Sequence, residues 1–152
     1  MYFDGSRSND GARVGYVLIS LDGEKIMLAC QLVFECTNNI VEYEALVQGL
    51  YKAISLDVQY LQVFGDTEIV IKQVRNIIHC ISNHLKHYQT LVQSITSYFL
   101  DFYLSLILRL QISSSNLLAN VASKTIPPKD LCPDRFSLEL NFRPSIPNNI
   151  TN

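Results

Sequence analysis

The feature that most constrains this sequence is the order in which two kinds of apolar pattern follow one another. Short apolar runs with strand character come first, at Met1–Asp4, Gly15–Ile19 and Ile26–Phe34. The Asp22-Gly23 pair between the second and third runs is a turn signal, so these runs predict a β-hairpin. Apolar residues then recur three and four positions apart from about Ile40 to Ser55, which predicts a helix.

The remaining apolar segments continue the alternation of strands and helices. They predict a strand at Tyr60–Phe64, a helix after Asp66 and a second helix at His84–Phe99. A strand at Tyr103–Leu110 and a short helix around Leu117–Ser123 follow. Strands that follow one another through helices run parallel by right-handed crossover, whereas a hairpin is antiparallel. The order therefore predicts an α/β fold with a mixed sheet.

Length and composition indicate a single packed domain with a tail. The chain has 152 residues, of which 48% are hydrophobic and 17% charged, and these values are typical of a globular protein and exclude disorder for most of the chain. All five prolines lie beyond Ile126. We therefore expect a domain over residues 1–124 and an extended, proline-containing tail over residues 125–152.

Charge and cysteine content exclude several classes of protein. Twelve basic and fourteen acidic residues give a net charge of -2, so a strongly basic nucleic-acid-binding surface is not expected and a polyanion must be held locally or through metal ions. The four cysteines form no C-x-x-C pair, which argues against a zinc site or a disulfide framework. Without a signal peptide or membrane span, the expectation is an intracellular, non-secreted protein with no membrane partner.

Three acidic residues stand where predicted elements begin or end. Asp4 and Asp66 end two strands, and Glu42 lies in the first helical turn. Three converging carboxylates repel one another unless a cation lies between them, and oxygen ligands suit Mg²⁺. Local roles explain each residue equally well: Asp4 as a turn residue, Asp66 as a helix N-cap, and Asn39-x-x-Glu42 as a capping box. Spacing alone does not separate these alternatives.

Three sequence motifs add a family resemblance. Tyr2–Ser6 (YFDGS), Thr37–Leu46 (TNNIVEYEAL) and Gly65–Val70 (GDTEIV) resemble, in order and spacing, the leading motifs of type 1 ribonuclease H. More closely they resemble the ribonuclease H domain of plant Ty3/gypsy-type retrotransposon polyproteins. The tail at Phe136–Pro147 is similar to the segment that links ribonuclease H to integrase there, which implies reverse transcriptase and integrase regions of the same polyprotein as partners.

The resemblance implies a fold, an activity and a set of site residues. It implies a ribonuclease H-like five-stranded mixed sheet in the order 3-2-1-4-5, flanked by helices, and Mg²⁺-dependent cleavage of the RNA strand of RNA/DNA hybrids. In the family, carboxylates matching Asp4, Glu42 and Asp66, together with a fourth aspartate, hold two Mg²⁺ ions. The positions that contact the minor groove of the hybrid correspond to Ser6, Asn38, Asn39 and Thr67.

The sequence departs from the family at its fourth carboxylate. Asn116 occupies that position, and an amide oxygen coordinates a cation without contributing charge, so one metal site is expected to be weak and catalysis impaired. The loop between Leu110 and Asn116 contains no histidine to assist proton transfer. No role is assigned to His79, His84 or His87. Glu44, about 200° around the helix from Glu42, is expected to be a solvated surface charge.

Two other outcomes remain open at this stage. A catalytically inactive, nucleic-acid-binding remnant would keep the fold and lose turnover with the second metal site. The first strand is nearly truncated, since only three residues precede Asp4, and this raises the alternative of a decayed fragment that does not fold. The dispersed basic residues predict a solvated face rather than a phosphate-binding patch, and they are Lys72, Arg75, Lys86 and Arg109.

Overall fold

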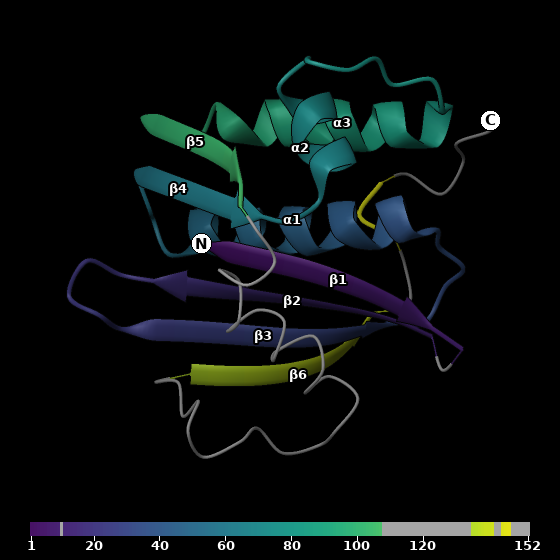
Figure 1. The fold of residues 1–152 in the computed structure, drawn as a ribbon. Coiled ribbons are helices and arrows are strands. Elements are labelled where there is room, and N and C mark those ends of the chain that lie inside the picture. Colours follow the sequence, from purple (N-terminus) through teal and green to yellow (C-terminus); the bar gives the residue numbers. More distant parts are fainter. Residues whose placement is uncertain (10, 108–134, 142–143, 147–152) are drawn as a thin grey trace.

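The computed structural model describes residues 1–9, 11–107, 135–141 and 144–146, which form a mixed sheet and three helices (Figure 1). The strands run in the spatial order β5-β4-β1-β2-β3-β6. In chain order the elements are β1 (Tyr2–Ser8), β2 (Gly11–Ile19), β3 (Lys25–Leu32), α1 (Asn38–Ser55), β4 (Tyr60–Gly65), α2 (Glu68–Val74), α3 (Asn83–Thr96), β5 (Asp101–Leu106) and β6 (Arg135–Asn141).

The predicted order of five strands, 3-2-1-4-5, is confirmed. β1, β2 and β3 pair antiparallel, while β4 pairs parallel with both β1 and β5. A sixth strand, which the sequence did not predict, extends the sheet: β6 runs parallel to β3 from Ile26↔Arg135 to Leu32↔Asn141. The predicted domain boundary at residue 124, the predicted helix at Leu117–Ser123, and Arg109 lie outside the described residues.

The first strand is longer than predicted. It continues to Ser8 and pairs with β2 along its whole length, although it pairs with β4 only at Tyr2↔Phe64. Met1 is buried, its amino group donates a hydrogen bond to the Gln62 carbonyl (2.6 Å), and its carbonyl accepts one from Phe64 N–H (2.8 Å). These two bonds extend the contact between β1 and β4 by one residue. The expected end of the strand at Asp4 is wrong, because β1 pairs with β2 as far as Ser8.

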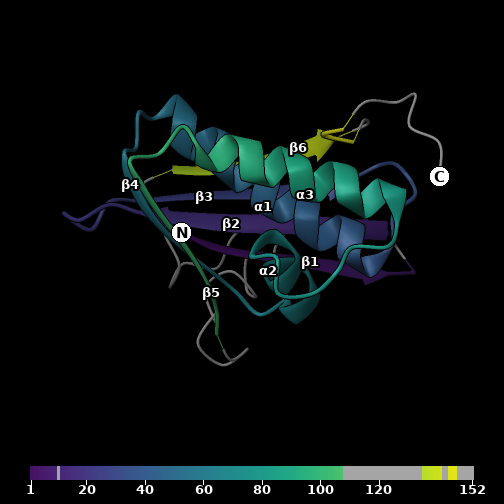
Figure 2. The same cartoon turned by 90° about the horizontal axis from the view of Figure 1, so that it is seen from above.

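One face of the sheet packs against all three helices and forms the main core (Figure 2). Alternate strand residues such as Phe3, Tyr16 and Val63 point into this core, as the period of two in a strand requires. Leu46 and Leu50 of α1 belong to the same core. Burial of these side chains is the main driving force for the fold. Among the described residues, no helix is long and apolar enough to cross a membrane.

Two glycines allow the elements beneath the carboxylates to approach closely. A Cβ atom at Gly5 would lie 2.7 Å from Val41 Cγ1 and 2.9 Å from the Val41 carbonyl oxygen, so β1 and α1 touch there through the backbone. A Cβ atom at Gly65 would lie 2.5 Å from the Phe3 ring. Gly5 follows Asp4, Val41 precedes Glu42 and Gly65 precedes Asp66, so these close contacts set the spacing of all three acidic residues.

Candidate metal centre

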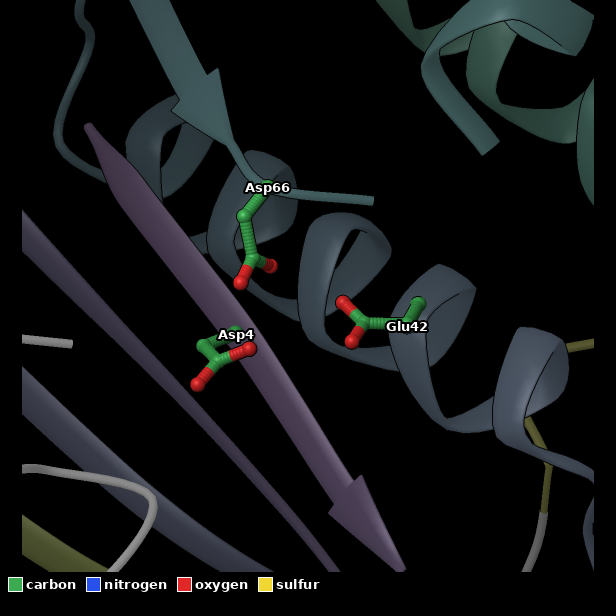
Figure 3. A group of neighbouring side chains, drawn as sticks. All are labelled: Asp4, Glu42 and Asp66. Atoms are coloured by element: carbon green, nitrogen blue, oxygen red, sulfur yellow. The ribbon is translucent and has the colours of Figure 1, made fainter. Parts of the chain in front are cut away.

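The structure brings Asp4, Glu42 and Asp66 together (Figure 3). One carboxylate oxygen from each residue lies within 4.8 Å of the other two. Asp4 is buried, and the other two side chains are half-buried. The three residues come from β1, from α1 and from the end of β4, so a tertiary arrangement rather than a local turn creates the cluster.

Sheet register places the two aspartates beside each other. β1 and β4 run parallel with Tyr2 opposite Phe64, and Asp4 and Asp66 each follow these positions by two residues. Since side chains repeat every two residues along a strand, both carboxylates lie beside each other on the same side of the sheet, where β4 ends. Glu42 reaches them from the second turn of α1, held against β1 by the Gly5–Val41 contact.

Helix capping does not account for Glu42 or Asp66. The N-cap of α1 is Thr37, whose side chain accepts a hydrogen bond from Ile40 N–H (3.3 Å), so the predicted capping box from Asn39 to Glu42 is wrong. The N-cap of α2 is Thr67, so the alternative that Asp66 caps this helix is also wrong. The local alternatives for these two acidic residues are therefore removed.

The chemistry of the cluster suits a hard divalent cation. Three carboxylates this close destabilise one another when all are ionised, and a cation between them relieves the repulsion. Asp4 Oδ1, Glu42 Oε2 and Asp66 Oδ2 are buried oxygens that accept no hydrogen bond from the described residues, although each of these side chains interacts elsewhere in the protein. An all-oxygen donor set fits Mg²⁺ or Mn²⁺ better than softer metals.

The four residues expected to contact a nucleic acid border the carboxylates. Ser6 lies two residues beyond Asp4 on β1, on the same side of the strand, and Thr67 directly follows Asp66. Asn38 and Asn39 lie four and three residues before Glu42, so they share its side of α1. Ser6 and Asn38 are exposed, whereas Asn39 and Thr67 are half-buried. Asn116, the expected fourth ligand, lies outside the described residues.

Glu44 corrects one prediction. It is not a solvated surface charge, because its side chain is 0% exposed. Tyr88 Oη donates a hydrogen bond to Glu44 Oε1 (2.5 Å), and Ser145 donates two, from N–H to Oε1 and from Oγ to Oε2 (both 2.7 Å). Gln48 Nε2 donates a weaker one to Oε2 (3.3 Å). Burial, and then the neighbouring Glu44 charge, raise the pKa of Tyr88, so its hydroxyl stays a donor.

The histidines and the lysine of α2 lie apart from this chemistry. His79 lies between α2 and α3, and His84 and His87 are on α3; among the described residues, no histidine joins a cluster that could hold a metal. Lys72 pairs with Glu68 one turn earlier on α2, as is typical of a solvated helix face.

Comparison with known proteins places this geometry in context. Residues 2–122 match the family described as reverse transcriptase-like. The ribonuclease HI of Halobacterium salinarum is 31% identical over 123 residues, which make up 80% of this chain and 62% of that protein. The chain thus spans less than two thirds of the length of that relative.

Solved structures share the fold. The crystal structure of ribonuclease H1 from Halobacterium salinarum superposes with a TM-score of 0.75 at 26% identity, covering 82% of this chain and 96% of that one. The N-terminal ribonuclease H domain of Rv2228c from Mycobacterium tuberculosis gives 0.70 at 24% identity, covering 81% and 91%. LC11 ribonuclease H1, solved in complex with an RNA/DNA hybrid, gives 0.69 at 21% identity, covering 78% and 91%. The last two likenesses concern the fold alone.

Proposed function

The chain belongs to the reverse transcriptase-like family and contains a ribonuclease H-like domain, and we propose that it is a Mg²⁺-dependent endonuclease that cleaves the RNA strand of RNA/DNA hybrids. The observation that carries this proposal is the convergence of Asp4, Glu42 and Asp66 within 4.8 Å. The three carboxylates would hold the metal, and their side chains supply fixed negative charge rather than a covalent nucleophile.

Asp4, Glu42 and Asp66 would hold Mg²⁺, which would supply a lowered pKa for the attacking water and stabilisation of the departing oxygen. The expected products of the cleavage are a 3′-hydroxyl and a 5′-phosphate. The protein contributes the geometry. Asp4 and Asp66 are fixed by paired strands, and Glu42 is fixed by a helix in backbone contact with β1. Such rigidity keeps the ligands in place without reorganisation during the reaction.

The residues around the cluster suit a hybrid substrate. Ser6 and Thr67 offer hydroxyl groups, and Asn38 and Asn39 offer amides, which can contact 2′-hydroxyls and base edges without sequence preference. The net charge of -2 makes broad electrostatic attraction weak, so binding would rest on these contacts and on the metal. LC11 ribonuclease H1, which shares the fold of this chain, was solved in complex with such a hybrid.

We propose Asn116 as a weak fourth ligand, which would leave one of two Mg²⁺ sites impaired. This residue motivates the second candidate function, a catalytically inactive nucleic-acid-binding remnant of a retrotransposon polyprotein. An origin beside reverse transcriptase and integrase regions belongs to the same proposal, and the reverse transcriptase-like family match supports its reverse transcriptase part.

Cleavage of a labelled RNA/DNA hybrid in Mg²⁺ tests the proposal, with Asp66→Asn and Asn116→Asp as variants. Activity in the parent that disappears in Asp66→Asn would establish an enzyme that works with three carboxylates. If the parent does not cleave the hybrid and Asn116→Asp does, the parent is a folded domain disabled at one metal ligand. Hybrid binding without cleavage in all three proteins would favour the inactive remnant.

A further inference from the structure

We propose that Glu44, Tyr88 and Ser145 form a latch, a set of hydrogen bonds that ties the C-terminal segment to α1 and thereby positions Glu42 in the carboxylate cluster. The C-terminal segment here means β6 and residues 144–146. Ser145 lies 101 positions from Glu44 in the sequence, and Tyr88 lies 44 positions away. The latch therefore joins three distant parts of the chain. The proposal rests on the metal-binding function above and deepens it by naming positioning residues outside the cluster.

The hydrogen bonds of the latch are short and converge on one buried carboxylate. Both oxygens of Glu44 are used, Oε1 by Tyr88 Oη and Ser145 N–H, and Oε2 by Ser145 Oγ. A buried carboxylate is tolerated only when donors replace its lost hydration, so each donor carries substantial energy. These occupied oxygens make Glu44 a structural anchor rather than a metal ligand.

The C-terminal segment is anchored on both sides of the latch residue. Before Ser145, β6 pairs with β3 over seven residue positions. Directly after it, Ile146 is 5% exposed and belongs to the core shared with Val41 and Leu46 of α1. The segment thus connects one edge of the sheet with the helix that carries Glu42.

The helix transmits the effect of the latch to the cluster. Glu42 and Glu44 are two residues apart, hence about 200° apart around α1, and they project to different sides. Glu44 lies three residues after Val41, on the same side of α1, so the latch holds the helix beside the point where its backbone touches β1 at Gly5. Asp4 and Asp66 are fixed by strands, so the distance from them to Glu42 depends on where α1 sits.

A metal site responds strongly to such small displacements. Mg²⁺ requires near-octahedral oxygens at about 2.0–2.1 Å, so a ligand displaced by a fraction of an ångström contributes much less. Opening the latch should therefore weaken metal binding although no metal ligand is changed.

Two substitutions at Ser145 open the latch in steps. Ser145→Ala removes the hydroxyl donor, and Ser145→Pro removes the hydroxyl and the N–H. The control is Ser97→Ala, because Ser97 Oγ also donates a short hydrogen bond (2.7 Å, to the Ser94 carbonyl) but does so on an exposed turn after α3. Two readouts are needed: Mn²⁺ affinity by calorimetric titration, and hydrogen exchange of the β6 amides.

We expect Mn²⁺ binding to weaken about twofold to threefold in Ser145→Ala and about fivefold to tenfold in Ser145→Pro, in line with one or two lost hydrogen bonds. Exchange of the β6 amides should accelerate about tenfold in Ser145→Pro, with both readouts unchanged in Ser97→Ala. Faster exchange with Mn²⁺ affinity within twofold of the parent would overturn the positioning role. Unchanged exchange in Ser145→Pro would overturn the latch itself.

Failure of the underlying function gives a different result. If the parent and Asp66→Asn titrate identically with Mn²⁺, the carboxylate cluster is not a metal site, and both the proposed function and the positioning role fall. The exchange data would then still report whether Ser145 holds the segment. Glu44→Gln, which keeps the side-chain volume, should weaken Mn²⁺ binding about twofold to threefold, as Ser145→Ala does.

Discussion

Glu42 and Glu44 lie two residues apart on α1 and meet different surroundings. Around Glu42 stand two further carboxylates, Asp4 and Asp66, within 4.8 Å. Around Glu44 stand neutral donors, the hydroxyl of Tyr88 and the N–H and hydroxyl of Ser145. Glu44 is the more deeply buried of the two, yet it has the surroundings of a structural residue. Burial of a carboxylate therefore does not identify a metal site, because the charge of its neighbours decides what it can bind.

Substitutions at the two sites should affect different properties of the protein, catalysis at the carboxylate cluster and stability at Glu44. Neutralising a member of the carboxylate cluster relieves repulsion, so it should cost function and not stability. Removing Glu44 leaves buried hydrogen-bond donors without an acceptor, so it should lower the free energy of unfolding. Three experiments test this contrast, and a fourth extends it to another buried charge.

The largest effect is expected on catalysis. In whichever background cleaves the hybrid, the parent or Asn116→Asp, Glu42→Gln and Asp66→Asn should each lower the cleavage rate by at least about 1,000-fold, or about 4 kcal/mol in the barrier. In metal-free buffer, their unfolding free energy should stay equal to the parent's or rise by up to about 1 kcal/mol, since a like charge is removed. Initial rates and urea unfolding measure the two quantities. A clear loss of stability in both variants would contradict the contrast.

The next effect concerns the folding free energy. Glu44→Ala should destabilise the protein by about 2–4 kcal/mol, because it leaves Tyr88 Oη and Ser145 N–H without their acceptor and opens a cavity. Urea unfolding monitored by circular dichroism measures this. Glu35→Ala, at an exposed glutamate before α1, is the matched control and should stay within about 0.5 kcal/mol of the parent. Equal effects at the two positions would show that Glu44 is not a buried anchor.

Mg²⁺ itself should separate the two glutamates. At a concentration of about 100 times its dissociation constant, Mg²⁺ should raise the unfolding free energy of the parent by about 2.7 kcal/mol. Glu42→Gln should lose most of this gain, whereas Glu44→Gln should keep the larger part of it. Thermal unfolding with MgCl₂, against NaCl of equal ionic strength, provides the measurement. The same gain in Glu42→Gln as in the parent would place the ion elsewhere.

The smallest effect extends the comparison to a buried cation. Desolvation lowers the pKa of the Met1 amino group from 8.0 to about 6. Between these values the unfolded chain binds more protons than the folded one, so stability should rise with pH, by up to about 2 kcal/mol from pH 6 to pH 8. Urea unfolding at both pH values measures this rise. An N-terminally acetylated chain lacks the titrating group and serves as the control; the same rise in that chain would assign the effect to other groups.

Most of the fold was predictable because its signals are local. Apolar periods of two and about 3.6 residues predicted the strands and helices of residues 1–107, and right-handed crossover connections predicted a mixed sheet. Boundaries were less accurate where pairing decides them. β5 pairs with β4 from Tyr60↔Asp101 to Gly65↔Leu106, so it begins two residues before the strand predicted from Tyr103.

The candidate site was predictable only in part. Asp4, Glu42 and Asp66 were identified because each stands within a family motif, at a predicted strand end or in a predicted early helical turn. The alternative capping roles of Glu42 and Asp66 could be dismissed only when Thr37 and Thr67 were found at the N-caps. The role of Glu44 was missed because its hydrogen-bond partners lie far from it in the sequence and no local pattern indicates them.

The sequence by itself determined most of the elements, their order and the identity of the three acidic residues, because periodicity, turn signals and short motifs act over a few residues. Only the tertiary structure decided that Glu44 is buried and that a sixth strand joins the sheet. The donors to Glu44 lie 44 and 101 positions away, and β6 pairs with a strand more than 100 residues earlier. Contacts over such separations depend on where packing places each element, which no local pattern records.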